Sequence, residues 1–183
     1  FFFHRIFLDL AQNKKLNKLL KVLFDGAYML NQQNGLINSP NALYEQSRWH
    51  RDLPYQHFVS SKNIAINVIF CIDSFDNNNG ASLVLPYSHL FEEFPSPDFV
   101  EKNKLSINAK KGDFIILNAM TYHRGGDNVS SNDRRGINTV YSIPYIRHQI
   151  DVECLDYNYK LSKKDKIFLG HNFSSLKSIK KIL

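Results

Sequence analysis

Three side chains that favour transition metals are spaced so that the backbone could bring them together. His50-Arg51-Asp52 ends a segment of strand character, and residues i and i+2 of a strand point to the same face. His123 ends the strand-like run 114–122, which follows the turn at 111–113. Two His and one carboxylate on one face of a metal form the facial triad that leaves coordination positions open, as in non-haem Fe(II) oxygenases.

A cation follows these candidate ligands at a fixed interval. Arg134 lies eleven residues after His123, at the start of the next strand-like run. The planar guanidinium binds a carboxylate through two parallel hydrogen bonds and keeps its charge. The arrangement therefore suits a dicarboxylate cosubstrate. Taken alone, the H-x-D pair is more often a surface or capping pair. The other histidines lack a comparable sequence context: His4, His57, His89, His148 and His171.

The elements that must position these residues begin with one amphipathic helix. Apolar residues recur at helical spacing at positions 16, 19, 20, 23 and 24, and lysines occupy the other face. Asn13 is a plausible N-cap and Gly26 a C-terminal stop, which predicts a helix over about 14–25.

After this helix the pattern changes to strands. Asn34-Gly35 is the strongest two-residue hairpin signal and should end a short strand over 27–32. Further strands are expected over 63–72, 82–86, 114–117 and 136–146. Short strands separated by Gly, Asn and Pro turns favour an antiparallel sandwich or a jelly roll. Short terminal helices are expected over 163–168 and 175–182.

Composition limits the class of protein. A chain of 183 residues with 43% hydrophobic residues corresponds to one domain with a large core. No run approaches the roughly 18–20 apolar residues of a membrane-spanning helix. The start at Phe1 lacks the features of a signal peptide, so we expect further residues upstream. Two isolated cysteines, Cys71 and Cys154, favour a reducing, cytoplasmic setting.

The net charge of +6 is concentrated at one end of the chain. Residues 160–183 contain seven Lys and one acidic residue, so their net charge equals that of the whole chain and the remainder is neutral. A nucleic-acid groove needs basic residues spread among stacking aromatics. We therefore expect a basic C-terminal tail and no nucleic-acid or membrane partner.

The order and spacing of several motifs resemble the phytanoyl-CoA dioxygenase family of Fe(II)/2-oxoglutarate oxygenases from about residue 27 to 147. The pattern N-N-G-x-L-x-x-x-P-x-S-H and the interval H-x(10)-R are more specific than H-x-D. The matching pieces are His50-Arg51-Asp52, the stretch 77–89, Lys111-Gly112-Asp113-Phe114, His123, Asn128 and Arg134-Arg135.

The resemblance implies a mainly β fold with flanking helices, the double-stranded β-helix, which is a cupin-like jelly roll. The resemblance places a jelly-roll core at about 27–147, and with the chain length and the charge distribution we expect a single domain over 1–183 with the basic tail at 160–183. Fe(II) would be held by His50, Asp52 and His123, and Arg134 would pair with the distal carboxylate of 2-oxoglutarate. Asn67 and Gln33 fall at positions where the family uses polar residues near this cosubstrate.

The implied function is hydroxylation of a small organic substrate with O2, releasing succinate and CO2. Asp52 is present, whereas related halogenases replace this carboxylate with Gly or Ala, so hydroxylation is favoured over halogenation. The stretch before His50 is shorter than is usual in the family, so we expect few substrate contacts from it. The alternative is a non-catalytic or 2-oxoglutarate-independent cupin-like metal-binding protein. The substrate and the oligomeric state stay open.

Overall fold

A computed structural model describes residues 1–42, 44–53 and 58–173. The chain divides into two compact units, one formed by Gln33–Tyr141 and the other by Phe1–Gln32 with Ser142–Leu183. The helix predicted over 175–182 and the residue His57 lie outside the described residues.

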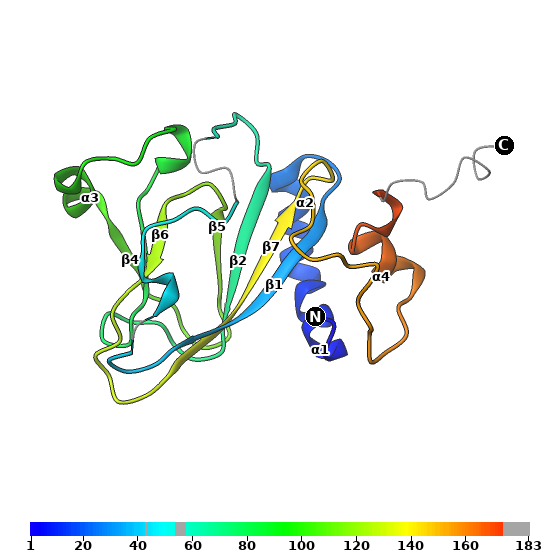
Figure 1. Cartoon of the computed structure of the whole chain (residues 1–183), viewed down its shortest axis with the longest axis horizontal. Coiled ribbons are helices and arrows are strands. Elements are labelled where there is room, and N and C mark those ends of the chain that lie inside the picture. Colours follow the sequence, from blue (N-terminus) through cyan, green and yellow to red (C-terminus); the bar gives the residue numbers. More distant parts are fainter. Residues whose placement is uncertain (43, 54–57, 174–183) are drawn as a thin grey trace. The chain divides into compact units, whose positions relative to one another are not determined.

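The unit formed by residues 33–141 contains two sheets that face each other (Figure 1). The larger sheet has the order β1 (Met29–Asn38), β7 (Arg134–Ser142), β2 (Ala65–Cys71) and β5 (Phe114–Asn118). The smaller sheet has the order β4 (Leu105–Ile107), β3 (Ser82–Val84) and β6 (His123–Gly125). Three short helices connect these strands: η1 (Glu45–Ser47), η2 (Ser88–Leu90) and α3 (Pro97–Asn103).

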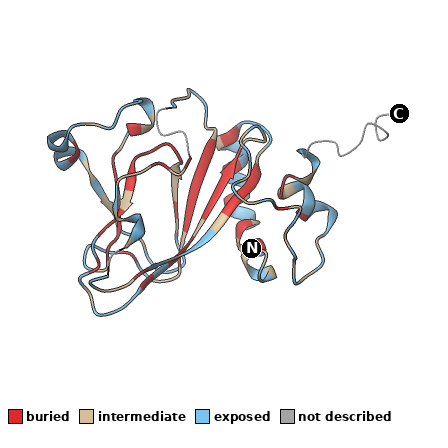
Figure 2. Cartoon of the chain, viewed as in Figure 1, coloured by how far each residue is buried: buried red, intermediate tan, exposed pale blue. Residues whose placement is uncertain are grey.

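The core of this unit depends on the central strand β2. Its sequence AINVIFC is buried at all but one position (Figure 2). Apolar and β-branched residues at successive positions are typical of a strand that is buried on both faces. Antiparallel pairing with β5 places Asn67 opposite Leu117 and Ile69 opposite Ile115. The buried apolar cluster at this position comprises Ile69, Cys71, Phe75, Ala81 and Ile115.

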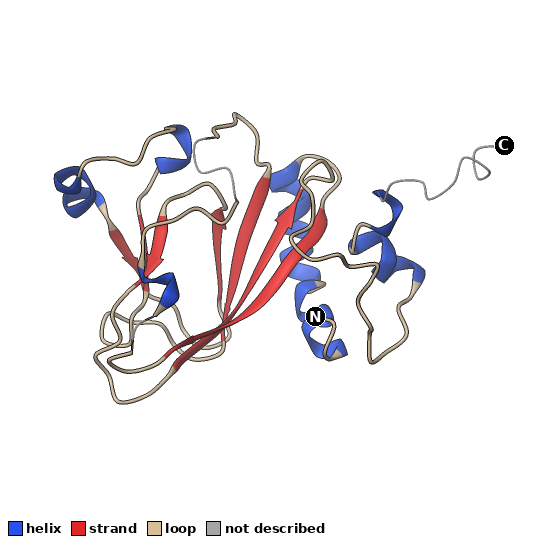
Figure 3. Ribbon diagram, in the orientation of Figure 1, coloured by secondary structure: helices blue, strands red, loops and turns tan. Residues whose placement is uncertain are grey.

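In its described part, the other unit combines helices with loops and the first residues of β1 (Figure 3). It contains α1 (Arg5–Ala11), α2 (Lys14–Phe24), α4 (Lys163–Phe168) and the short helix η3 (His171–Phe173). The side chain of Asn13 accepts hydrogen bonds from the first turn of α2, which confirms the predicted N-cap. The helix ends at Phe24, and its C-cap Asp25, whose φ of 48° is left-handed, comes one residue before the predicted stop at Gly26.

Two sequence-based expectations are wrong. Asn34-Gly35 forms no hairpin turn, because β1 continues through both residues and pairs with β7, from a distant part of the chain. His123 does not end a strand over 114–122; β5 ends at Asn118, and His123 begins β6 in the smaller sheet. In both cases pairing with a remote strand overrides the local signal. No helix in the described part of the chain is long and apolar enough to cross a membrane.

Candidate metal centre

Backbone hydrogen bonds bring together two segments that are far apart in sequence. His50 and His123 form an antiparallel bridge in which each N–H donates to the carbonyl of the other at 3.0 Å. The N–H of Asp52 donates to the carbonyl of Ala119 at 3.0 Å. The extended segment around His50 therefore lies beside the start of β6, and the backbone itself sets the positions of the three candidate ligands.

The three candidate ligand side chains converge. The Nε2 atom of His123 lies 3.6 Å from Oδ2 of Asp52, and Nε2 of His50 lies 3.9 Å from Oδ1. One ligand atom from each of His50, Asp52 and His123 can be chosen so that all lie within 4.8 Å of one another. Two imidazoles and one carboxylate are the donor set of the facial triad.

Hydrogen bonds to the far side of each ring orient the imidazoles. Nδ1 of His50 lies 2.7 Å from the carbonyl of Arg48, and Nδ1 of His123 lies 2.9 Å from the carbonyl of Thr121. A carbonyl oxygen can only accept, so each Nδ1 carries the proton and each Nε2 presents a lone pair to the cluster. Burial is the larger cause that lowers the pKa of His50, and the neighbouring His123 is the next. The lowered pKa favours the neutral ring that can bind a metal.

Asn67 holds the carboxylate between these rings. It is fully buried on β2, and its Nδ2 donates to Oδ2 of Asp52. Arg51, between the two candidate ligands, is directed elsewhere: its guanidinium lies 4.1 Å from the centre of the Tyr122 ring and donates to the carbonyls of Ser88 and Phe91. The alternation expected for an extended segment therefore separates Arg51 from the side chains of His50 and Asp52.

Arg134 is buried, with 1% of its surface exposed. Its Nη2 donates to the carbonyl of Gly80 at 3.0 Å, and its guanidinium lies 4.3 Å from the centre of the Phe75 ring. Within the described residues it forms no ion pair with a carboxylate. Burial lowers the pKa of Arg134, which reflects the cost of holding this charge away from water.

A small cavity of about 20 Å³ is lined by two of the candidate ligands, His50 and His123, and by Arg134. Four buried polar atoms of its lining residues have no hydrogen-bond partner: Nε2 of His50, Oδ1 of Asn67, Oδ1 of Asn138 and Nε of Arg134. An unpartnered buried polar atom typically costs about 1–3 kcal/mol. Nε of Arg134 is a donor that an anionic oxygen could satisfy, whereas Nε2 of His50 and the two amide oxygens are acceptors that suit a metal ion or a hydrogen-bond donor.

The structure brings most of the predicted site residues to this cavity. His50, His123, Asn67 and Arg134 line it, and the carboxylate of Asp52 contacts the first three of them. Gln33 is not one of its lining residues; its side-chain amide donates to the hydroxyl of Thr139 at 3.2 Å.

The lining residues that sequence reasoning missed include Asn138 and Tyr44. Asn138 lies four residues after Arg134 on β7, so strand alternation could have identified it. Tyr44 lies outside any strand, and its ring centre is 5.6 Å from the guanidinium of Arg134. No local pattern signals that contact.

The paired sheets and the His-Asp-His cluster define the class of protein: a β-sandwich with a facial-triad site. The sequence profile of the phytanoyl-CoA dioxygenase (PhyH) family matches residues 2–136. The chain belongs to this family, as the sequence motifs predicted.

Curated relatives extend the comparison. Protein Mb1539 of Mycobacterium bovis is 29% identical over 130 residues, which cover 67% of this chain and 46% of that protein. Dioxygenase af480 of Aspergillus fumigatus is 31% identical over 85 residues, covering 45% of this chain and 28% of the relative. The chain thus spans about half the length of the first of these relatives and a smaller share of the second.

Solved structures share the fold. The epimerase SnoN from nogalamycin biosynthesis, described as non-heme and alpha ketoglutarate dependent, matches with a TM-score of 0.62 and 19% identity, over 82% of this chain and 63% of its own. HygX from Streptomyces hygroscopicus matches with a TM-score of 0.65 and 11% identity, over 85% and 74%. These neighbours are double-stranded β-helix proteins, so the predicted fold class is confirmed.

Proposed function

We propose that this chain carries the catalytic centre of an Fe(II)- and 2-oxoglutarate-dependent dioxygenase that hydroxylates a small organic substrate, releasing succinate and CO2. One observation carries the proposal: His50 and His123 of the His-Asp-His cluster line a cavity together with Arg134, a buried cation that has no acidic partner among the described residues. A metal-binding protein without this cosubstrate has no evident need for that cation.

The residues present fit Fe(II). His50 and His123 would each bind it through Nε2, and Asp52 would bind it through one carboxylate oxygen. Bound Fe(II), with O2 and 2-oxoglutarate, supplies the oxidising power for hydroxylating a C–H bond. Asn67 would hold Asp52 at a fixed angle, because it donates to the oxygen nearer His123.

Arg134 would bind the distal carboxylate of 2-oxoglutarate. Its Nε has no partner, and its Nη2 is held by the Gly80 carbonyl, so the guanidinium is oriented before the ligand arrives. The Oδ1 atoms of Asn67 and Asn138 would accept hydrogen bonds from water or substrate in the same cavity. A cosubstrate contact by Gln33 stays a prediction.

The cavity is small, so the ligand must displace a side chain. About 20 Å³ holds roughly one water molecule. Tyr44 packs on Arg134 from a segment outside the strands. We therefore propose that binding of 2-oxoglutarate displaces the Tyr44 ring from Arg134.

The decisive experiment loads the protein with Fe(II) without oxygen, adds 2-oxoglutarate and records the absorption band of the Fe(II)–2-oxoglutarate chelate. Oxygen is then admitted, and succinate is measured with and without a panel of small organic substrates. The proposal expects the band, slow uncoupled succinate release and faster release with a substrate.

Product masses then define the reaction. A gain of one oxygen supports hydroxylation, whereas an unchanged mass with inverted stereochemistry indicates an epimerase, the reaction named for SnoN. Because Asp52 is present, no chlorinated product is expected in chloride buffer. Iron binding with neither chelate band nor succinate would instead support the cupin-like alternative.

A further inference from the structure

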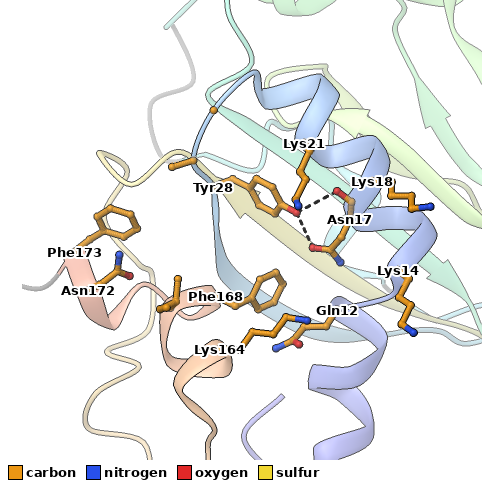
Figure 4. Close-up of a pocket in the computed structure, with 13 residues that line it drawn as sticks. Gln12, Lys14, Asn17, Lys18, Lys21, Tyr28, Lys164, Phe168, Asn172 and Phe173 are labelled. Carbon is orange, nitrogen blue, oxygen red and sulfur yellow. Dashed lines mark hydrogen bonds between the residues drawn. The ribbon is translucent and has the colours of Figure 1, made fainter.

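A second cavity lies wholly within the unit formed by residues 1–32 and 142–183, and its volume is about 620 Å³. This size is within the range of small-molecule sites, about 300–1,000 Å³. Its walls come from α2 and the segment after it on one side and from α4 and η3 on the other (Figure 4). None of its lining residues lines the cavity of the metal centre.

Four lysines line this cavity. Lys14, Lys18 and Lys21 lie on α2 at spacing i, i+4 and i+7, which places them along one face of the helix. Lys164 is contributed by α4. Among the described residues, none of the four forms an ion pair.

The acidic residue next to Lys164 does not neutralise these charges. The carboxylate of Asp165 is buried and accepts hydrogen bonds from Arg5, Gln12 and Ser162. The Asp165 carboxylate is therefore already paired with Arg5, and Asp165 is not one of the residues that line the cavity. The cavity presents four positive charges with no acidic lining residue.

The remaining lining is mainly apolar. Tyr28 and Phe168 meet edge to face, with ring centres 6.5 Å apart, and the Tyr28 hydroxyl donates to Oδ1 of Asn17 at 2.7 Å (Figure 4). Ile167 and Phe173 remain 49% and 46% exposed. A ligand that covered these groups would remove apolar surface from water, which is favourable by roughly 25 cal/mol per Å².

We propose that this cavity binds a free amphipathic anion, a molecule with an apolar chain or ring and one carboxylate head group. The apolar part would lie against Tyr28, Phe168 and Ile167, and the head group would lie among the lysines of α2. The segment 174–183 is disfavoured as the occupant, because it contains three lysines and no acidic side chain. The proposal does not depend on the iron chemistry.

The test is a calorimetric titration of the full chain with monomeric dodecanoate at low salt. Three probes separate the contributions: dodecanol has no charge, dodecyltrimethylammonium has the opposite charge, and acetate has no apolar chain. We expect saturable binding of dodecanoate at one site, and affinity at least tenfold lower for each of the other probes.

Charge reversal identifies the site. The double variant Lys18→Glu/Lys21→Glu should weaken dodecanoate binding at least fivefold, because two attractive charges become repulsive. The matched control is Lys15→Glu, an exposed lysine of the same helix that does not line the cavity. It should change the affinity less than twofold, and circular dichroism checks that all variants are folded.

Several outcomes would overturn the proposal. Equal affinity for dodecanol would mean that the lysines play no part in recognition. Binding to anionic phospholipid vesicles without binding to monomeric dodecanoate would indicate a membrane surface instead. Equal weakening by Lys15→Glu would show only diffuse attraction to a basic helix, and no binding by the folded full chain would exclude the site.

Discussion

Arg134 and Arg135 are consecutive residues of β7 with opposite environments. Arg134 is buried against the Gly80 carbonyl and the Phe75 ring. Arg135 is exposed, and its Nε and Nη2 donate to the carboxylate of Asp73 at 2.8 and 3.0 Å. Strand alternation thus separates a cation available to a ligand from one that already has a protein partner.

Arg134→Ala should raise the apparent Michaelis constant for 2-oxoglutarate roughly 30-fold or more. Loss of a partly buried charge pair costs about 2–5 kcal/mol, and about 1.4 kcal/mol corresponds to tenfold in affinity. Arg135→Ala is the matched control and should change this constant little. Uncoupled succinate release measured against 2-oxoglutarate concentration tests both variants. A larger effect at Arg135 would contradict the assignment.

His123→Ala should abolish Fe(II) retention and turnover without unfolding the chain. The ring lines a polar cavity that water can fill after truncation, and two remaining ligands hold the metal poorly. His89→Ala is a suitable control, because His89 lies outside the ligand cluster. Anaerobic equilibrium dialysis measures the bound iron. Tight binding by His123→Ala would refute the proposed metal site.

Asn67→Ala should weaken Fe(II) binding by about 10–100-fold, since partners that orient metal ligands typically contribute this much. The reason is the loss of the hydrogen bond that Asn67 donates to Asp52. The control is Asn138→Ala, which removes an amide from the same cavity. Among the described residues, the Asn138 side chain forms no hydrogen bond with Asp52. It should leave Fe(II) affinity within about threefold. Equal losses in both variants would mean that the cavity, and not the orientation of Asp52, controls the metal.

Asp165→Asn should destabilise the unit formed by residues 1–32 and 142–183 by roughly 2–4 kcal/mol. It should also weaken the dependence of the unfolding free energy on pH in acid. Burial alone would raise the pKa of Asp165, but hydrogen bonds from Arg5 and Ser162 outweigh it and lower the pKa in the folded protein. Such a carboxylate stabilises the fold above its unfolded pKa of about 3.9, and the contribution is lost as pH falls toward the folded pKa.

Urea unfolding between pH 7 and pH 2.5 measures this effect. The unmodified chain should lose stability most steeply below about pH 4, and Asp165→Asn should show a smaller slope there. The control Asp9→Asn removes an exposed partner of the same arginine and should cost less than about 1 kcal/mol. Identical acid slopes in the unmodified chain and Asp165→Asn would contradict the assignment.

Elements specified by neighbouring residues were predictable from the sequence. The Leu and Lys spacing and Asn13 predicted helix α2 to within a residue, and the helix expected over 163–168 has those bounds in the structure. The apolar run at 63–72 contains strand β2. Helical periodicity, helix caps and runs of β-branched and apolar residues depend on residues that are close in sequence. They can therefore be recognised without knowledge of the fold.

Other features depended on contacts between distant segments. Asn34-Gly35 lies inside β1 because pairing with β7 outweighs a local turn preference. The bond from Asn67 to Asp52 and the packing of Tyr44 on Arg134 likewise join segments with no local pattern. The sequence alone determined which residue types could form the metal centre. Only the tertiary structure decided which of their atoms stay unpartnered, since burial and long-range hydrogen bonds exist only once the sheets have packed.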